Sequence, residues 1–274
     1  MTRLLFIGDI VGKPGRELVR RGLAGLVAHH RIDLVIANGE NAAAGFGITP
    51  DLAEELFAWG VHVISGGNHS WDKKEIVPYM ADHPRLLRPA NFPAGTPGRG
   101  RVVVEAQNGV SVAVINVMGR VFMTALDDPF RVVADEIGVA RRDARVIFVD
   151  FHAEATSEKV AMGWHLDGRA TAVVGTHTHV ATADARVLPQ GTAYITDVGI
   201  TGPHDSVIGV ERSAVLQRFL TGLPQRFETA TENPRLNGVI VTADEATGRA
   251  AGIEQLSLSA REIEALAVAP AGAR

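Results

Sequence analysis

The sequence predicts an α/β fold, and three observations support that prediction. In the first third of the chain, short apolar runs alternate with segments of helical spacing, which is the rhythm of parallel strands joined by helices. In the middle, two runs rich in β-forming residues flank Asn108-Gly109, which is a strong signal for a hairpin turn. The composition, with 46% hydrophobic and 21% charged residues among 274, suits a chain that buries a sizeable core.

The first third is predicted to alternate strand and helix three times. Pro14 suits the first turn of one helix, and Thr49 followed by Pro50 suits the N-cap and first position of the next. A Gly- and Ala-rich loop over residues 41–49 precedes that second helix. This order predicts a largely parallel sheet. The expected strands cover residues 3–8, 33–38 and 61–65, and the expected helices cover residues 14–30, 50–59 and 72–80.

The remainder of the chain begins with a Pro- and Gly-rich loop over residues 89–101. No low-complexity linker, charge block or internal repeat divides the chain, so we expect one domain over residues 1–266. The Ala, Pro and Gly content of residues 267–274 predicts a flexible tail. The further strands expected cover residues 101–106, 110–117, 145–151, 171–175, 193–196, 238–243 and 251–258, and the further helices cover residues 128–141, 157–166 and 212–220.

The charge and cysteine counts exclude several functional classes. A net charge of −4 gives no reason to expect a general nucleic-acid or membrane-surface binder. The absence of cysteine excludes disulfides, Cys-ligated zinc and a thiol nucleophile. The apolar start at Leu4–Ile7 stops before Asp9, and it is too short for a signal peptide or a membrane span. We therefore expect a cytoplasmic protein without a membrane partner.

Side chains that bind metals follow the predicted strands. Carboxylates, carboxamides and imidazoles suit Mn, Fe and Zn, and a neighbouring glycine lets the backbone turn sharply there. Because open α/β sheets assemble their sites at the carboxyl ends of strands, we expect these groups to meet and form the site of a metal-dependent hydrolase. His177 and His179, two positions apart, would face the same way in an extended segment. The residues at these strand ends are Asp9, Glu40, Asn41, Asn68, His69, His152, His177 and His179.

Each of these residues has a plainer interpretation when taken alone. Asp9 and Asn41 are common types of turn or cap residue, and His152 could be a buried, hydrogen-bonded histidine. The metal site is favoured because all of them share one topological location. The histidines that do not share it, and to which we assign no functional role, include His29, His30, His62 and His83.

Much of the chain resembles the calcineurin-like metallophosphoesterases, whose motifs run in the order GD, GNH, H and GHxH. The sequence motifs are still more similar to those of the bacterial YmdB-like branch of that superfamily. The resemblance extends from Leu4 to about Leu258. It implies two facing mixed β-sheets flanked by helices, in four α/β/β/α layers. The stretches that carry it are FIGDIVGKPGR, ANGENAAAGFGIT, SGGNHSWDKKE, RPANFP, DFHAEATSEK, VVGTHTHVATADARVLP and TDVGITGP.

Three departures from the superfamily pattern distinguish this chain. The usual Asp-x-His start is absent because Val11 stands two residues after Asp9. Glu40 replaces the usual bridging aspartate, and Gly-Thr-His-x-His replaces Gly-His-x-His. The YmdB-like branch shares these features. Compared with the metal site of the superfamily, these departures leave one metal ion without its usual histidine ligand. Asn41 is the natural substitute for that ligand.

The resemblance implies a dinuclear site with a separate catalytic acid. Two divalent or trivalent transition-metal ions, Fe or Mn ahead of Zn or Mg, would generate a hydroxide for in-line attack on phosphorus. His69 stays outside the ligand set and would protonate the leaving group. The first ion would take Asp9, Glu40, Asn41 and His179, and the second would share Glu40 as a bridge and take Asn68, His152 and His177.

Substrate contacts are harder to assign than metal ligands. Lys13 and Arg16 open the helix after Asp9, and two cations at a helix start favour phosphate, although a solvated helix start is an equal alternative. Thr178 is a further candidate for substrate contact. We expect a phosphodiesterase acting on small phosphodiesters, for which the resemblance suggests 2′,3′-cyclic nucleotides. The alternative functions are a weakly catalytic or non-catalytic nucleotide sensor and a metal-dependent amide hydrolase. The sequence leaves open whether the chain forms a homo-oligomer.

Overall fold

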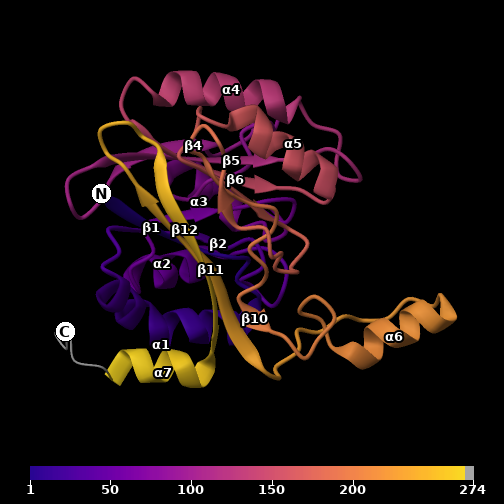
Figure 1. The fold of residues 1–274 in the computed structure, drawn as a ribbon. Coiled ribbons are helices and arrows are strands. Elements are labelled where there is room, and N and C mark those ends of the chain that lie inside the picture. Colours follow the sequence, from indigo (N-terminus) through magenta and orange to yellow (C-terminus); the bar gives the residue numbers. More distant parts are fainter. Residues whose placement is uncertain (269–274) are drawn as a thin grey trace.

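The computed structural model describes residues 1–268 and shows two facing six-stranded β-sheets with helices on both outer faces (Figure 1). The strands are β1 (Thr2–Ile7), β2 (Leu34–Asn38), β3 (Val63–Ser65), β4 (Arg101–Glu105), β5 (Ser111–Met118), β6 (Val146–His152), β7 (Ala172–Thr176), β8 (Arg186–Val187), β9 (Ala193–Ile195), β10 (Gly202–Pro203), β11 (Pro234–Ala243) and β12 (Ala250–Ser259). The helices are α1 (Gly12–His30), α2 (Pro50–Ala58), α3 (Ile76–Asp82), α4 (Pro129–Ala140), α5 (Thr156–Leu166), α6 (Arg212–Thr221) and α7 (Ala260–Val268).

The first sheet contains the parallel strands predicted for the first third of the chain. Its order is β10-β11-β1-β2-β3, and β12 pairs with β11. Strands β1, β2 and β3 are parallel, whereas β11 is antiparallel to β1. The predicted N-cap also forms, because the Thr49 hydroxyl accepts a hydrogen bond of 3.3 Å from the Leu52 N–H at the start of α2.

The second sheet has the order β4-β5-β6-β7-β9-β8. Strands β4 and β5 form the antiparallel hairpin predicted at Asn108-Gly109, and Gly109 has a φ of 82°, which a glycine adopts without strain. Strands β5, β6, β7 and β9 are parallel to one another. The middle of the chain therefore builds a mixed sheet with a parallel centre.

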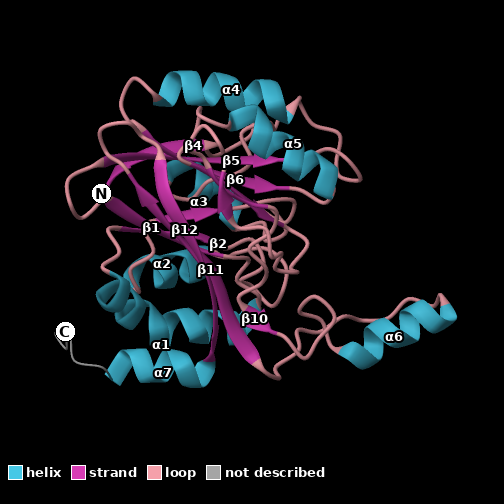
Figure 2. Ribbon diagram, viewed as in Figure 1, coloured by secondary structure: helices cyan, strands magenta, loops and turns pink. Residues whose placement is uncertain are grey.

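Three hydrophobic clusters hold the four layers together. One lies between the sheets, where the Phe6 ring stacks on Phe148 with centroids 5.3 Å apart. A second, which includes Leu56, packs α1, α2 and α7 on the first sheet, and a third, which includes Met162, packs α4 and α5 on the second. Figure 2 shows these helices on the two outer faces. None of the helices within residues 1–268 is long and apolar enough to cross a membrane.

Helix α7 is absent from the predicted set, although its signal is present in the sequence. Ser259 and Glu262 form a capping box: the Ser259 N–H donates to Glu262 Oε2 at 2.7 Å, and the Glu262 N–H donates to the Ser259 hydroxyl at 3.3 Å. Ile263 then packs into the cluster around α1. The helix extends to Val268, so the first two residues of the predicted tail are helical, and residues 269–274 lie outside the described residues.

Residues 204–233, which carry α6, project from the body and are referred to as the arm (Figure 1). Backbone hydrogen bonds tie its two legs together near the body, among them the following two. The Ala230 N–H donates to the Gly209 carbonyl at 3.0 Å, and the Glu211 N–H donates to the Glu228 carbonyl at 2.9 Å. These bonds fix the base of the arm.

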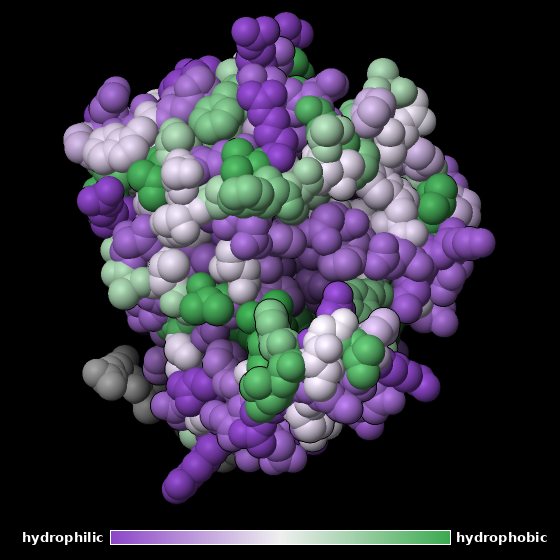
Figure 3. Space-filling view, turned by 90° about the vertical axis from the view of Figure 1, so that its right-hand side faces the viewer, coloured by the Kyte–Doolittle hydropathy of each residue, from purple (hydrophilic) through white to green (hydrophobic). Residues whose placement is uncertain are grey.

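The helix of the arm buries little of its surface. Val215 is the one buried residue of α6, whereas Phe219 and Leu220 are 82% and 84% exposed. Figure 3 shows hydrophobic side chains gathered on the part of the molecule that faces the viewer, beside a hollow in the surface. The arm therefore depends on its base for its position, because α6 contributes almost nothing to the core.

Candidate metal centre

The predicted ligands come together at one edge of the sandwich, where parallel strands of both sheets end. Asp9, Glu40 and Asn68 follow β1, β2 and β3 in the first sheet. His152 ends β6 and His177 follows β7 in the second sheet. The His177 N–H donates to Asp9 Oδ2 at 3.3 Å, which joins the two sheets at this edge. Residues from five strands thus form one site, as expected for the carboxyl ends of strands.

Four side chains converge at the centre of this edge. His152 Nε2 lies 3.1 Å from Glu40 Oε1, 2.9 Å from Asn68 Oδ1 and 3.1 Å from His177 Nδ1. Donor atoms of Glu40, His152 and His177 all lie within 4.8 Å of one another. Together with Asn68 these side chains are referred to as the donor cluster. These oxygen and nitrogen atoms carry more lone pairs than protons, so they cannot satisfy one another by hydrogen bonding alone. A cation among them would do so.

A buried series of hydrogen bonds orients His152 from behind. The Thr176 hydroxyl donates to Asp150 Oδ1 at 2.7 Å, and its oxygen lies 2.9 Å from His152 Nδ1, from which it accepts. The proton that His152 shares with Glu40 is therefore the one on Nε2, and its loss would leave on Nε2 the lone pair that a metal ligand needs. The other oxygen of Asp150 accepts from the Ser65 hydroxyl at 2.5 Å, so the same carboxylate also fixes the end of β3.

Glu154 is a site residue that the sequence analysis missed. Its Oε2 lies 3.2 Å from His177 Nε2, while the opposite ring nitrogen of His177 faces His152. A carboxylate in this place holds the proton on Nε2 and leaves Nδ1 free as a ligand. The only signal in the sequence is the position of Glu154, two residues after His152 at a strand end.

A second group of donors contains the residues predicted for the first ion. Asp9 Oδ1 and Asn41 Oδ1 are buried and have no hydrogen-bond partner among residues 1–268. The Asn41 amide donates to the Gly45 carbonyl at 3.0 Å, and His179 Nδ1 donates to the Ile208 carbonyl at 2.8 Å, which leaves His179 Nε2 free. Because a buried acceptor without a partner destabilises the fold, these atoms fit a bound cation.

The charges inside the cluster depend on one another. Burial disfavours the ionised form of Glu40, but the neighbouring His152 outweighs burial and lowers the pKa of Glu40 to about 2. Burial also opposes charge on His152, but Glu40 raises the pKa of His152 to about 9. Burial, and then the charge of His152, lower the pKa of His177 to about 3. The site thus favours one positive charge among its carboxylates, and a metal ion would take the place of the proton on His152.

His177 and His179 flank Thr178 in a loop of unusual backbone geometry. The φ angle is 97° at His177 and 66° at His179, values that side-chain-bearing residues rarely adopt. Asp197 holds the loop by accepting hydrogen bonds from the Thr178 N–H at 3.2 Å and from its hydroxyl at 2.8 Å, and Lys159 pairs with Asp197 at 2.5 Å. The predicted extended segment is wrong, although both histidines and Thr178 line one pocket.

His69 lies beside the donor cluster without belonging to it. Its backbone N–H donates to Glu40 Oε2 at 2.8 Å, and its ring Nδ1 lies 2.7 Å from Asp72 Oδ2. The ring Nε2 is therefore the nitrogen left for a partner in the pocket. Asp72 belongs to this turn, which explains why α3 begins at Ile76 and not at Asp72 as predicted. Gly67 lies so close to the donor cluster that any side chain there would clash with it.

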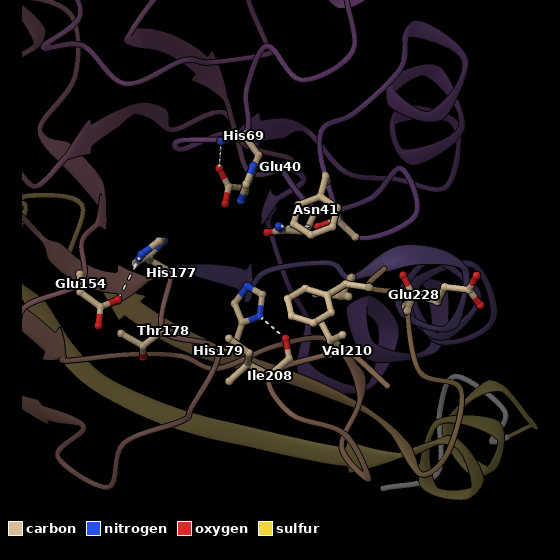
Figure 4. Close-up of a pocket in the computed structure, with 16 residues that line it drawn as sticks. Glu40, Asn41, His69, Glu154, His177, Thr178, His179, Ile208, Val210 and Glu228 are labelled. Carbon is tan, nitrogen blue, oxygen red and sulfur yellow. Dashed lines mark hydrogen bonds and ion pairs between the residues drawn. The ribbon is translucent and has the colours of Figure 1, made fainter. Parts of the chain in front are cut away.

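The donors open into a pocket of about 370 Å³ (Figure 4). Figure 4 shows Glu40, His69 and His177 across the pocket from Ile208 and Val210 of the arm. The polar side chains that line it include Glu40, Asn41, His69, Glu154, His177, Thr178, His179 and Glu228. The apolar side chains that line it are Val11, Phe46, Ile208, Val210 and Phe227.

The two cations predicted to contact substrate lie outside this pocket. Lys13 lines a separate groove beside α1, and the Arg16 guanidinium donates to the Ala42 carbonyl. The loop after β2 covers the start of α1, since the Gly12 N–H donates to the Asn41 carbonyl at 3.0 Å. The structure therefore brings neither cation to the pocket, in contrast to the prediction.

Comparison with known proteins identifies the family. The family model for the YmdB-like protein matches residues 5–256. The chain belongs to the YmdB-like family. It is 51% identical to a 2′,3′-cyclic-nucleotide 2′-phosphodiesterase of Bacillus subtilis, over 94% of this chain and 97% of the relative. The crystal structure of a hypothetical protein from Thermus thermophilus superposes with a TM-score of 0.87 at 44% identity, covering 94% of this chain and 99% of the other.

The four-layer fold is that of the calcineurin-like phosphoesterases. The crystal structure of the calcineurin-like phosphoesterase YfkN from Bacillus subtilis superposes with a TM-score of 0.56 at 14% identity, covering 95% of this chain and 91% of the other. At that identity the likeness concerns the fold alone. The predicted fold and the predicted family are both confirmed, and family membership places the chain among the hydrolases of the phosphoesterase superfamily.

Proposed function

We propose that this chain is a dinuclear metal-dependent phosphodiesterase that opens 2′,3′-cyclic nucleotides. The donor cluster around His152 and the unpartnered oxygens of Asp9 and Asn41 support metal-assisted hydrolysis. The Bacillus subtilis relative, which is named for this substrate class, shares 51% identity with the chain. The charge of the pocket supports a diester as the substrate.

The charge of the side chains that line the pocket is the observation that favours diesters over monoesters. Among the described residues, no Lys or Arg lines the pocket, whereas Glu154 and Glu228 do. A phosphodiester has one negative charge and a monoester usually has two, so a monoester would need further cations around it. The two carboxylates would instead repel the second charge of a monoester.

The side chains that would hold two ions surround Glu40, the proposed bridge. Their oxygen and nitrogen donors, without sulfur, suit Fe or Mn. When bound, the ions would supply a nucleophilic water and neutralise charge on the phosphate oxygens. The first set is Asp9, Glu40, Asn41 and His179, and the second is Glu40, Asn68, His152 and His177.

His69 would donate the proton that the leaving oxygen needs. Its Nδ1 is held by the Asp72 carboxylate at 2.7 Å, so Nε2 carries the proton to be transferred, and Asp72 stabilises the charged ring. In a 2′,3′-cyclic nucleotide the leaving group would be the ribose 2′-oxygen, by analogy with the relative named a 2′-phosphodiesterase. The product would be a 3′-nucleotide.

The test compares three substrates on the metal-loaded protein. With Mn²⁺ we expect kcat/KM to be higher for a 2′,3′-cyclic nucleotide and for bis-p-nitrophenyl phosphate than for p-nitrophenyl phosphate. Faster hydrolysis of the monoester would contradict the diesterase assignment. Tight nucleotide binding without turnover, with Mn, Fe, Zn and Mg alike, would favour the nucleotide sensor.

A further inference from the structure

The apolar side of the pocket has no part in the metal chemistry. Three segments build it: the turn after β1 supplies Val11, the loop after β2 supplies Phe46, and the arm supplies the rest. Ile208 and Val210 come from the outgoing leg of the arm, and Phe227 comes from the returning leg. Apolar side chains that line a pocket beside a few convergent polar groups are typical of a small-molecule site.

The loop after β2 holds Phe46 beside His69. The centroids of the two rings lie 5.1 Å apart in an edge-to-face arrangement. A hydrogen bond of 2.8 Å from the Ala43 N–H to the Gly47 carbonyl closes the loop, and Gly47 has a φ of 78° that suits glycine. Phe46 remains 40% exposed. The loop thus presents an aromatic ring to the pocket instead of burying it.

The base of the arm holds Phe227 on the same side of the pocket. The guanidinium of Arg218, in α6, lies 5.2 Å from the centroid of the Phe227 ring. The hydrogen bond between the Glu211 N–H and the Glu228 carbonyl, at 2.9 Å, fixes the backbone next to the ring. Phe227 is half-buried at this position. Two rings from distant parts of the chain therefore line the pocket next to the metal donors.

We propose that Phe46 and Phe227 form the subsite for the nucleobase of the substrate, an inference that rests on the proposed function. With the phosphate at the metal donors, the base is the aromatic part of the nucleotide that remains to be bound. Stacking accepts every base, because each base has a π-face. The subsite would therefore select nucleotides over phosphodiesters that lack a base, with little preference among bases.

The experiment compares 2′,3′-cyclic AMP with the 2,3-cyclic phosphate of methyl riboside, which lacks the base. Phe227→Leu is the main variant, because Phe46 contacts His69, and leucine keeps an apolar contact while removing the ring. We expect a higher KM for the base-free diester. We expect Phe227→Leu to raise KM for cyclic AMP by roughly 5- to 50-fold at unchanged kcat, without changing KM for the base-free diester. Phe227→Trp should restore the low KM.

Phe219→Leu is the matched control, because Phe219 lies in the same arm on the exposed surface of α6, and the substitution should leave both KM values unchanged. Equal KM values for the two substrates, or an equal change for both in Phe227→Leu, would overturn the subsite. Calorimetric titration with the 3′-nucleotide and with methyl riboside 3-phosphate measures the same difference without turnover. A protein that hydrolyses neither diester would thus defeat the proposed function, while the titration would still decide on the subsite.

Discussion

The metal centre and the arm meet at one pocket but are built in opposite ways. The donors of the metal centre lie at the ends of core strands, and Asp9 and His152 are completely buried. The arm carries a helix that buries only Val215 and is held by the hydrogen bonds at its base. The core therefore positions the proposed metal donors, whereas the proposed base subsite lies on loops that bury less surface.

One direct contact joins the two regions. His179 Nδ1 donates to the Ile208 carbonyl at the base of the arm, at 2.8 Å. The cluster around His152 has no such dependence, because Asp150 and Thr176 of the core orient it. Movement of the arm would therefore reach the proposed first ion through His179 and leave the proposed second ion in place.

The largest difference between the two regions should appear in stability. Phe148 is completely buried between the sheets, so Phe148→Ala should lower the free energy of unfolding by about 3–5 kcal/mol. Phe219→Ala, on the arm, should change it by no more than about 0.5 kcal/mol. Urea denaturation measures both. A large loss in Phe219→Ala that depends on protein concentration would show that the arm packs against a second copy in solution.

The next largest effect concerns the proposed acid. His69→Ala should lower kcat by roughly 10²–10⁴-fold for the cyclic nucleotide while the metal content stays unchanged, because His69 lies outside the donor cluster. Elemental analysis and steady-state kinetics test both parts, and His29→Ala, on the surface of α1, serves as the control. Loss of metal in His69→Ala would show that His69 is a ligand.

A smaller effect is expected at Glu154, which holds His177 from the rim of the pocket. Glu154→Gln should weaken metal binding by about 10–100-fold, because the amide no longer stabilises the proton on His177 Nε2. Chelator competition measures the affinity, and kcat at saturating metal should change little. Glu228→Gln is the matched control, since that carboxylate also lines the pocket but pairs with Arg226 at 3.6 Å. Equal affinities in the two variants would remove Glu154 from the site.

The smallest effect is a response of the core to high pH. Burial raises the pKa of Tyr194 to about 12, whereas the pKa of tyrosine in an unfolded chain is about 10. Between these values the unfolded chain loses a proton that the folded chain keeps, so the free energy of unfolding falls as pH rises. Tyr194→Phe should flatten this fall in urea denaturation at rising pH. The arm contains no tyrosine, and an unchanged slope would contradict the burial effect.

The order of elements and the candidate donors could be predicted because both follow from local signals. Apolar runs mark the strands, and the parallel arrangement of β1 to β3 brings Asp9 and Glu40 to one edge. The prediction that two sheets face each other rests on the family resemblance, because no local signal in the sequence indicates how sheets pack. The strand-end residues lie together at one edge of the sandwich, which supports the inference that residues at the carboxyl ends of strands meet.

The remaining site residues depend on which loops meet, and local signals do not encode that. Phe227 reaches the pocket only because the arm returns to the body, and Glu154 matters only because His177 turns toward it. Lys13 and Arg16 are candidates for phosphate contact because they open a helix, but the loop after β2 covers the start of that helix. Tertiary contacts therefore decide which side chains line the pocket.

The presence of two ions at Glu40 is the claim on which the account depends most. Crystals of protein purified without chelator would test it by anomalous difference maps at the Fe and Mn edges. The account predicts two peaks per chain about 3.5–4 Å apart, with the Glu40 carboxylate between them. Asp9 and His179 should contact one peak, and His152 and His177 the other. The absence of any peak in the space bounded by Asp9, Glu40 and His177 would contradict it.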